Sequence, residues 1–376
     1  MTPARSSSSP PVHVVLAAGG TGGHMFPAEA LAEALLRRGC RLTLVTDRRG
    51  EAFGGTLGQL ETRRIRAGGV AGRGLLGRLS GGINLFLGLI QAHGLLRRLA
   101  PDVVVGFGGY ASLPPLLAAT HLKYPTVVHE QNALAGRANR WLARRVTAFA
   151  VAVDQARLPA GVAPVRVGMP VRPAVLALRD VPYAAAEGTA PFVLLVTGGS
   201  QGARVFSTLV PEALALLPEA QRRRLKVMQQ ARAEDLEAAR ERYAGTGITV
   251  ELAPFFADLP ARLAEAHLVV CRSGASTMGE LAVMGRPAIL IPYPHAIDDH
   301  QSANARGMDE AGGGWLMPQA PLTPHALAER ISWLMDHPEV LARAAACAHA
   351  LGVPDAAERL AELTLATARP SGETVT

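Results

Sequence analysis

A histidine placed directly after a glycine-rich turn is the first feature of this sequence that could do chemistry. The run Gly19–His24 reads GGTGGH and follows a short apolar segment centred on Val15. That segment predicts a buried strand, and the glycines allow a sharp turn into a helix that Pro27 would open and Gly39 would end. Backbone N–H groups at a helix start bind phosphate-type charge, and an imidazole there can move a proton. We therefore take His24 as a candidate general base.

The same loop has two plainer interpretations that the local sequence leaves open. Gly20 and Gly22 fit the start of a dinucleotide-binding fingerprint, and Asp47 lies near the position expected for a ribose-binding carboxylate. Met25 stands where the third glycine of that fingerprint would be. A nicotinamide or flavin site and a simple strand-to-helix turn both remain alternatives at this point.

A second glycine loop has the same sequence context. The apolar run Phe192–Thr197 is followed by GGSQGARV at Gly198–Val205, and a helical pattern begins near Ala203. Backbone N–H groups, the hydroxyl of Ser200 and a helix N-terminus would meet at one spot, forming a pyrophosphate site that needs no metal. Ser200 as an ordinary helix cap is the alternative, and the two roles are compatible.

One carboxylate has the chemistry to bind a ribose. Glu280 closes the run CRSGASTMGE, and a carboxylate can accept hydrogen bonds from both hydroxyls of a vicinal diol. The backbone of Gly274–Thr277 would then face the rest of the ligand. Thr277 and Glu280 also have the spacing of a capping box, so a purely structural role at a helix start stays open.

Polar residues gather after an expected strand in the first half of the chain. The run HEQN at His129–Asn132 groups a base, an acid and two amides at the sheet edge where His24 is expected. Tyr110, at the end of GFGGY, belongs to the same rim. The cluster predicts a sugar-binding wall and makes Glu130 and His129 further candidates for the base.

A metal site is not favoured by the residues that could form one. His295, Asp299 and His300 lie close together in HAIDDHQSANA. Asp298 and Asp299 are better interpreted as helix-start residues, which places His300 and Gln301 in the first turn. The chain contains no DxD sequence, so magnesium held by carboxylates at a pyrophosphate is not expected. We expect neither a metal nor another cofactor.

The elements that must position these residues alternate between strand and helix patterns. This alternation, with one glycine loop in each half, predicts an α/β fold of two doubly wound, Rossmann-like domains facing a central cleft. Proline breaks at Pro338 and Pro354 predict separate short helices at the end of the chain. The expected strands, besides the first, are Arg41–Thr46, Asp102–Val105, Thr126–His129, Ala148–Val153, Phe192–Thr197, Leu225–Gln229, Ile248–Leu252, His267–Cys271 and Ala288–Pro292.

Domain boundaries follow from composition. The stretch Val165–Pro173 is rich in proline and glycine and marks the junction between the two domains. We expect a first domain over residues 11–168 and a second over 169–350, with a helix over 354–367 that packs back on the first. Residues 1–10 are interpreted as a disordered leader and not a signal peptide, and 368–376 as a disordered tail.

Composition limits the partners. The chain has 376 residues, 49% hydrophobic residues, three cysteines at unrelated spacings and a formal net charge of +7. That charge favours an anionic partner, but dispersed arginines, few aromatics and no recognisable module argue against nucleic acid. Residues 73–98 combine apolar and basic residues without any acidic one. This segment predicts either contact with an anionic membrane surface or a helix pair whose leucines are core.

Taken in order, the motifs resemble one family. GGTGGH, GFGGY, HEQN, GMPVR, GGSQGA, SGASTMGE and DDHQxxNA, spread from Val12 to about Ala366, are similar to the bacterial transferases that add N-acetylglucosamine to undecaprenyl-linked muramyl-pentapeptide. These enzymes convert lipid I to lipid II in peptidoglycan synthesis. One departure is Met169, where many members have asparagine.

The resemblance implies a GT-B fold and a peripheral protein on the cytoplasmic side of the cell inner membrane, contacting it through residues 73–98. It implies UDP-N-acetylglucosamine and lipid I as substrates, with the donor held by the second domain. Phe256 matches a position where the family's backbone meets uracil. The implied sugar-nucleotide contacts are Thr21, Gly22, Gly23, Asn132, Arg172, Ser200, Phe256, Ala275, Ser276, Thr277, Met278, Gly279, Glu280 and Gln301, with Tyr110 on the acceptor side.

The reaction expected from the resemblance is an inverting transfer. The muramyl 4-hydroxyl would attack the anomeric carbon as UDP departs, with His24 as the first candidate for the base and Glu130 and His129 as the second. A UDP-N-acetylglucosamine 2-epimerase of similar architecture and a non-catalytic nucleotide-binding membrane scaffold are the alternatives.

Overall fold

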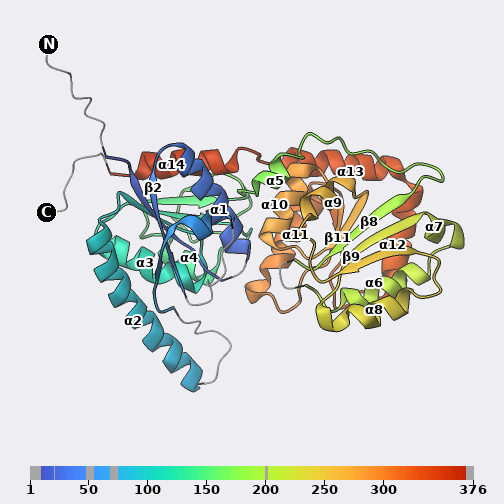
Figure 1. The fold of residues 1–376 in the computed structure, drawn as a ribbon, viewed down its shortest axis with the longest axis horizontal. Coiled ribbons are helices and arrows are strands. Elements are labelled where there is room, and N and C mark those ends of the chain that lie inside the picture. The colour runs from blue at the N-terminus through green and yellow to red at the C-terminus, as the bar shows by residue number, and fades with distance from the viewer. Residues whose placement is uncertain (1–9, 21, 48–54, 68–74, 200–201, 370–376) are drawn as a thin grey trace, which may run out of the picture. The chain divides into compact units, whose positions relative to one another are not determined.

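The structure is a computed structural model that describes residues 10–369, apart from 21, 48–54, 68–74 and 200–201. Its contacts divide the chain into two compact units (Figure 1). Unit 1 comprises residues 1–131, 135–170 and 355–376, and unit 2 comprises 132–134 and 171–354. Each unit is built around one parallel sheet, so the predicted α/β fold with two doubly wound sheets is confirmed.

Unit 1 contains a sheet of order β3-β2-β1-β4-β5-β6-β7. The central strand β1 is fully buried, and its alternate residues serve two cores, Val14 and Leu16 on one face and Val15 on the other. Such burial on both faces is typical of parallel sheets covered by helices. The strands are β1 (His13–Ala17), β2 (Arg41–Thr46), β3 (Glu61–Arg64), β4 (Val103–Gly106), β5 (Thr126–Glu130), β6 (Ala148–Val151) and β7 (Pro164–Arg166).

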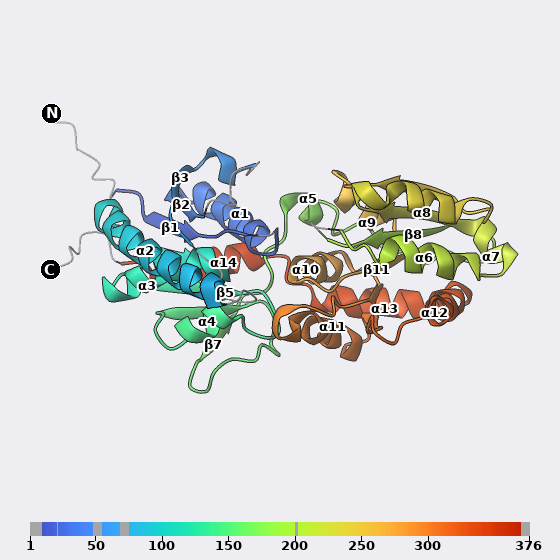
Figure 2. The same cartoon turned by 90° about the horizontal axis from the view of Figure 1, so that it is seen from below.

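Two groups of helices cover this sheet. Helices α1 (Gly22–Arg37) and α14 (Ala356–Thr367) pack on one face and on each other, as Figure 1 shows. Helices α2 (Leu75–Leu99), α3 (Gly109–His121) and α4 (Arg137–Leu142) cover the other, and α2 lies beside α3 (Figure 2). The last helix carries the salt bridge of Glu358 with Arg37 and Arg38, which ties the end of the chain to α1.

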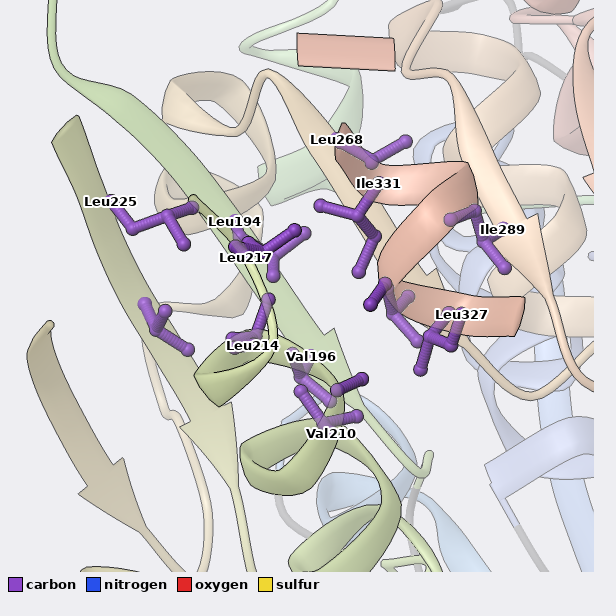
Figure 3. Packing of buried hydrophobic residues seen from close by; sticks show 14 of the residues in the cluster. Leu194, Val196, Val210, Leu214, Leu217, Leu225, Leu268, Ile289, Leu327 and Ile331 are labelled. Atoms are coloured by element: carbon purple, nitrogen blue, oxygen red, sulfur yellow. The ribbon is translucent and has the colours of Figure 1, made fainter. Parts of the chain in front are cut away.

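Unit 2 repeats this topology with a sheet of order β10-β9-β8-β11-β12-β13. In Figure 3 the side chains of Leu194 and Val196 on β8 meet Val210 and Leu214 of α6 and Ile331 of α12 in one of its two cores. The strands are β8 (Phe192–Thr197), β9 (Leu225–Gln230), β10 (Thr249–Ala253), β11 (Leu268–Cys271), β12 (Ala288–Leu290) and β13 (Gly314–Leu316).

The helices of unit 2 again lie on both faces of the sheet. Helices α6 and α12 belong to the core of Figure 3, and α10 and α11 contribute to the opposite core. The helices are α5 (Pro173–Leu176), α6 (Phe206–Ala215), α7 (Glu219–Arg224), α8 (Leu236–Tyr243), α9 (Leu259–Glu265), α10 (Ala275–Met284), α11 (His300–Glu310), α12 (Pro324–Asp336) and α13 (Pro338–Leu351). Single 3₁₀ turns occur at Leu57–Gln59, Ala233–Asp235 and Ile297–Asp299.

Two helix starts differ from the sequence prediction. Helix α1 begins at Gly22, so Pro27 lies inside it instead of opening it. Helix α10 begins at Ala275 with Gly274 as its N-cap and no side-chain cap, so the capping-box interpretation of Thr277 was wrong.

The segment at residues 73–98 forms one helix over its described part, so the prediction of a helix pair was wrong. Helix α2 runs over 25 residues despite its glycines. A Cβ at Gly88 would lie 1.9 Å from the carbonyl oxygen of Arg66, so this glycine is required for close packing of the preceding loop. Within the part of the chain that the structure describes, no helix combines the length and the apolar character needed to cross a membrane.

Candidate functional site

The two glycine turns of unit 1 follow neighbouring strands, because β1 and β4 pair in parallel. His24 lies in the first turns of α1, and its ring packs on the turn after β4. Gly108 and Gly109 there have φ of +87° and +72°, and a Cβ on Gly109 would lie 3.4 Å from His24 Cε1. The positive φ of both residues favours glycine, and a Cβ on Gly109 would be in van der Waals contact with the His24 ring. The two glycines at the end of GFGGY therefore form the surface against which the His24 imidazole packs.

A buried carboxylate is linked to the same turn through Asn139. Glu130 ends β5 and is 1% exposed, and its Oε2 accepts hydrogen bonds from the Gly136 N–H at 2.9 Å and from Asn139 Nδ2 at 2.8 Å. Asn139 Nδ2 is 3.1 Å from where a Cβ on Gly108 would be. The structure thus brings both His24 and Asn139, the hydrogen-bond partner of Glu130, to the same glycine turn.

Asn139 was missed by sequence reasoning. It lies on the short helix α4, is 2% exposed, and its Oδ1 has no hydrogen-bond partner among the described residues. A polar residue on the buried side of a helix was the available signal, but the helix is too short for its pattern to show which side that is. Burial of an amide requires partners, and here Glu130 is one of them.

His129 is enclosed within unit 1. Its Nε2 is 3.0 Å from the Gly168 carbonyl oxygen, and Gln131 Nε2 is 3.1 Å from its Nδ1. Because a carbonyl can only accept and an amide NH₂ only donate, the proton lies on Nε2 and the ring is neutral. Burial lowers the pKa of His129 from 6.5 to about 4. Both nitrogens are therefore engaged with the interior of the unit, which leaves neither of them for a substrate hydroxyl.

The remaining expected residues of unit 1 lie at the same sheet edge or outside the described residues. Gly22 and Gly23 form the start of α1, and Tyr110 is half-buried in the first turn of α3. Thr21 lies outside the described residues, as does Ser200 in unit 2.

In unit 2 the two expected charged contacts bind each other. Glu280 on α10 is 5% exposed; its Oε1 accepts a hydrogen bond at 2.8 Å from Nε of Arg172 and forms a salt bridge at 2.8 Å with Nη2 of the same residue. Burial raises the pKa of Glu280, and the Arg172 guanidinium opposes that rise. Residues 108 positions apart therefore form one buried ion pair, and the arginine favours the ionised carboxylate.

Asn304 on α11 joins two other expected residues to the start of α10. Its Nδ2 donates at 3.0 Å to both Asn132 Oδ1 and the Ser273 carbonyl oxygen. The Ser273 hydroxyl donates at 2.8 Å to the Gln301 carbonyl oxygen, and Gln301 Oε1 accepts from the Tyr293 N–H at 2.9 Å. The expected helix start at Asp299, with Gln301 in the first turn, is confirmed. Asn304 itself was not predicted as a site residue.

The first turns of α10 offer partly buried polar groups. Ala275, Ser276, Thr277, Met278 and Gly279 are all of intermediate exposure. The Ser276 hydroxyl is buried and has no hydrogen-bond partner among the described residues. A buried hydroxyl at a helix start is suited to a polar ligand, because it can donate or accept.

The expected aromatic position lies after β10. The Phe256 ring is buried, and the guanidinium of Arg262 lies 4.1 Å from its centroid. Arg262 in turn forms two hydrogen bonds with Glu251, at 2.6 and 2.8 Å. The side chain of Phe256 is therefore held inside unit 2, which is consistent with an expected contact through its backbone.

The glycine loop of unit 2 differs from expectation. The Gly198 N–H donates to Gln230 Oε1 at 3.1 Å, the Gly199 N–H to Thr197 Oγ1 at 3.3 Å, and the Gly202 N–H to the Gly199 carbonyl oxygen at 3.0 Å. These three groups are satisfied within the protein, and Ser200 and Gln201 lie outside the described residues, so the phosphate site expected at this loop stays a prediction. The following helix also begins later, at Phe206.

A buried arginine that sequence reasoning missed lies beside α10. Arg272 donates to the carbonyl oxygens of Ile291 and Pro292 at 3.0 and 2.9 Å and to Gln319 Oε1 at 2.7 Å. Burial lowers its pKa to about 10, so the group remains cationic at neutral pH. A fixed positive charge therefore lies at the end of β11, one residue before Ser273. Its position inside CRSGAS, between an apolar run and a helix start, was the only signal.

Family descriptions and relatives agree on one assignment. The N-terminal domain of glycosyltransferase family 28 matches residues 14–151, and the C-terminal domain matches 193–360. A UDP-N-acetylglucosamine–N-acetylmuramyl-(pentapeptide) pyrophosphoryl-undecaprenol N-acetylglucosamine transferase of Rhodospirillum rubrum is 68% identical over 358 residues, covering 95% of this chain and 92% of the relative. The Paramagnetospirillum magneticum protein of the same name is 56% identical over 94% of this chain and 96% of its own.

Solved structures agree with this assignment. The crystal structure of Acinetobacter baumannii MurG has a TM-score of 0.77 and 29% identity, covering 95% of this chain and 100% of its own. The UDP-GlcNAc 2-epimerase of Neisseria meningitidis, with a TM-score of 0.64, 13% identity and coverage of 94% and 100%, shares the fold alone. The resemblance seen in the motifs and the GT-B fold are thus confirmed. The chain belongs to glycosyltransferase family 28 and, within it, to the UDP-N-acetylglucosamine–N-acetylmuramyl-(pentapeptide) pyrophosphoryl-undecaprenol N-acetylglucosamine transferases.

Proposed function

We propose that the protein transfers N-acetylglucosamine from UDP-N-acetylglucosamine to the muramyl 4-hydroxyl of lipid I and so forms lipid II for peptidoglycan. The observation that carries this proposal is the 68% identity, over 95% of the chain, to a relative named for that transfer. The spatial grouping of His24 and Glu130 in unit 1 and of Arg172 and Glu280 in unit 2 supports it.

Most of the proposed donor contacts belong to unit 2. Glu280, kept ionised by Arg172, would accept hydrogen bonds from the two ribose hydroxyls. The buried hydroxyl of Ser276 supplies a further polar group at the start of α10. The backbone of Phe256 would contact uracil. The remaining proposed donor contacts are Thr21, Gly22, Gly23, Asn132, Ser200, Ala275, Thr277, Met278, Gly279 and Gln301.

The proton step is assigned to unit 1. His24 would take the proton of the 4-hydroxyl while the oxygen bonds to the anomeric carbon and the bond from that carbon to UDP breaks. The electron pair of that bond leaves on the diphosphate, and the configuration inverts. Glu130, which accepts a hydrogen bond from Asn139, is the second candidate for the base. His129, with both nitrogens engaged in the interior, is better suited to supporting this edge of the sheet. Tyr110 is assigned to the acceptor side.

Membrane contact is assigned to helix α2. Ile83, Phe86 and Ile90 are 52%, 62% and 54% exposed, and their spacing of three and four places them on one face of the helix. Arg97 and Arg98 lie in its last turn. An apolar stripe with a basic end is suited to the headgroup region of an anionic membrane. We therefore propose a peripheral protein on the cytoplasmic side of the inner membrane.

Transfer of labelled sugar to lipid tests the proposal. With radiolabelled UDP-N-acetylglucosamine, we expect label in a lipid-extractable product only when lipid I or a short-chain analogue is present. Release of UDP without acceptor, with conversion of the sugar, would instead identify an epimerase. Binding of UDP without any turnover in the presence of lipid I would identify a non-catalytic scaffold. Either of these two results would overturn the proposed function.

A further inference from the structure

One buried glutamine joins the ends of three neighbouring strands in unit 2. Gln230 is the last residue of β9, which lies between β8 and β10, and it is 6% exposed. Its Oε1 accepts hydrogen bonds from the Thr197 hydroxyl at 3.0 Å and from the Gly198 N–H at 3.1 Å. Its Nε2 donates to the Pro254 carbonyl oxygen at 3.3 Å. A single amide therefore ties the residue after β8 to the residue after β10.

The partners fix the direction of this amide. The Gly198 N–H can only donate and the Pro254 carbonyl can only accept, so a flipped amide would lose both hydrogen bonds. The Thr197 hydroxyl, which donates to Gln230, also accepts from the Gly199 N–H at 3.3 Å. The first two glycines of the loop are therefore both held, directly or through Thr197, by Gln230.

The two tied segments lead to different parts of the proposed donor site. Beyond Gly198 the glycine loop continues toward α6, and beyond Pro254 lies Phe256, whose backbone is the proposed uracil contact. Because β9 separates β8 from β10, the two segments start roughly 10 Å apart. A nucleoside diphosphate is long enough to span that distance, with its base at one segment and its phosphates at the other.

We infer that Gln230 is a positioning residue for the donor, setting the spacing between the glycine loop and the Pro254–Phe256 segment so that one nucleoside diphosphate engages both. This inference rests on the proposed function. Gln230 acts through Gly198 and Pro254 and need not contact the ligand. Its loss therefore weakens ligands that span both segments more than fragments that engage only one.

The chain offers a matched control at the neighbouring position. Gln229 lies on the same strand and is 0% exposed. Its Nε2 donates to the Phe206 carbonyl oxygen at 3.0 Å, and its Oε1 accepts from the Tyr243 hydroxyl at 2.6 Å. Gln229→Leu therefore removes a buried amide of the same kind from the same strand without touching either donor segment.

The test compares Gln230→Leu and Gln230→Glu with Gln229→Leu in the full-length protein. The glutamate variant keeps an acceptor for Thr197 and Gly198 but faces the Pro254 carbonyl with an oxygen, so it remains informative if the leucine variant folds poorly. Thermal unfolding measures stability. Calorimetry measures UDP affinity, and ligand-observed NMR measures the binding of uridine and of inorganic pyrophosphate.

We expect both Gln230 variants to bind UDP about tenfold more weakly than the wild type, the size typical of losing one or two buried hydrogen bonds. Uridine and pyrophosphate, which each engage one segment, should change by less than about twofold. The KM for the sugar nucleotide should rise in parallel, with little change in kcat. Gln229→Leu should lose stability and keep UDP affinity.

Three outcomes would overturn the inference. The first is UDP affinity in both Gln230 variants equal to that of Gln229→Leu. The second is an equal loss for uridine alone, which would mean that Gln230 supports only the base segment. In both cases the wild type binds UDP and the proposed function stands. A wild-type protein that binds no UDP would overturn the proposed function and this inference together.

Discussion

The strand order β3-β2-β1-β4-β5-β6 of unit 1 corresponds, strand for strand, to the order β10-β9-β8-β11-β12-β13 of unit 2, but the two units bury different basic residues. Among the described residues the buried histidines, His13 and His129, both belong to unit 1. The buried arginines, Arg272 and Arg286, both belong to unit 2. The same strand order thus buries imidazoles in unit 1 and guanidinium groups in unit 2.

This difference matches the proposed roles of the two units, with the proton step in unit 1 and donor binding mainly in unit 2. Burial lowers the pKa values of His13 and His129, so these two buried imidazoles are neutral near pH 7. Burial also lowers the pKa of Arg272 to about 10, which still leaves unit 2 a permanent cation. A proton can be exchanged where groups are neutral and titratable, whereas a diphosphate is bound best where positive charge is fixed. The chemistry of each unit follows from its side chains and not from its fold.

The largest expected effect is a loss of kcat when His24 of unit 1 is replaced. His24→Ala should lower kcat by about 10² to 10⁴-fold, the usual contribution of a general base, while UDP affinity stays unchanged. Single-turnover formation of lipid II and calorimetry with UDP would measure the two quantities. Near-normal turnover would remove His24 as the base, and a parallel loss of UDP affinity would break the division between the units.

The next effect concerns the acid stability of unit 1. The pKa of His129 falls from 6.5 to about 4 on folding. As pH is lowered, His129 therefore takes up a proton in the unfolded state before it does so in the folded state. The stabilisation is complete above pH 6.5 and is lost as pH falls toward about 4. Between pH 7 and pH 5 this amounts to about 2 kcal/mol, which His129→Gln should abolish.

A single fluorescent reporter makes this measurement specific to unit 1. Of the three tryptophans only Trp141 belongs to unit 1, so replacing Trp315 and Trp333 by phenylalanine leaves one probe. Guanidinium unfolding at the two pH values, with and without His129→Gln, then gives the difference. Equal pH dependence in both proteins would show that His129 does not titrate on unfolding in this range.

On the side of unit 2, Arg172 is expected to control the ionisation of Glu280. Burial raises the pKa of this carboxyl and Arg172 lowers it, so Arg172→Gln should let Glu280 take up a proton at higher pH. We expect the KM for UDP-N-acetylglucosamine to rise by about tenfold, and to rise further as pH is lowered from about 8 to about 6.

Two companion variants sharpen the Arg172 experiment. Arg172→Lys keeps a positive charge and should restore most of the pH independence. Glu280→Gln has no carboxyl to titrate, so its higher KM should not vary with pH over the same range. A pH-dependent KM in Glu280→Gln would place the titrating group elsewhere.

The smallest effect is expected at the surface of α2. Phe86→Ser removes the most exposed apolar side chain of the stripe, which is 62% exposed. Binding to vesicles containing anionic lipid should weaken by about tenfold, since burying one such side chain contributes about 1.5–3 kcal/mol. Trp333→Ser, at an exposed aromatic of unit 2 that is 42% exposed, is the control and should leave binding unchanged. Equal losses would mean that membrane contact is not confined to unit 1.

Buried central strands were predictable from sequence, and so was the five-residue edge strand β10, whereas the shorter edge strands were not. The predicted bounds of Arg41–Thr46 and Phe192–Thr197 match β2 and β8 residue for residue. The strands β3, β7 and β13 were missed because they lie at or near sheet edges, are three or four residues long, and carry exposed or partly exposed residues. An apolar run marks a strand only where both faces are covered.

The site was predictable in its residue types but not in its contacts. Arg172 and Glu280 were both expected near the donor, yet nothing local indicates that they bind each other across 108 positions. Asn304, Arg272 and Gln230 were missed because each acts by joining segments that are distant in sequence. The spacing of residues along the chain does not indicate such contacts, because they depend on which segments the folded sheet brings together.

Helix α14 has a consequence for how the protein is made. Its residues Leu360 and Ala361 are fully buried in the core of unit 1, although residues 171–354 of unit 2 precede them. A nascent chain emerging from the ribosome therefore exposes an unfinished hydrophobic surface on its first part throughout synthesis of the second. We expect unit 2 to reach its native state during translation, and unit 1 to finish folding only after α14 has been synthesised.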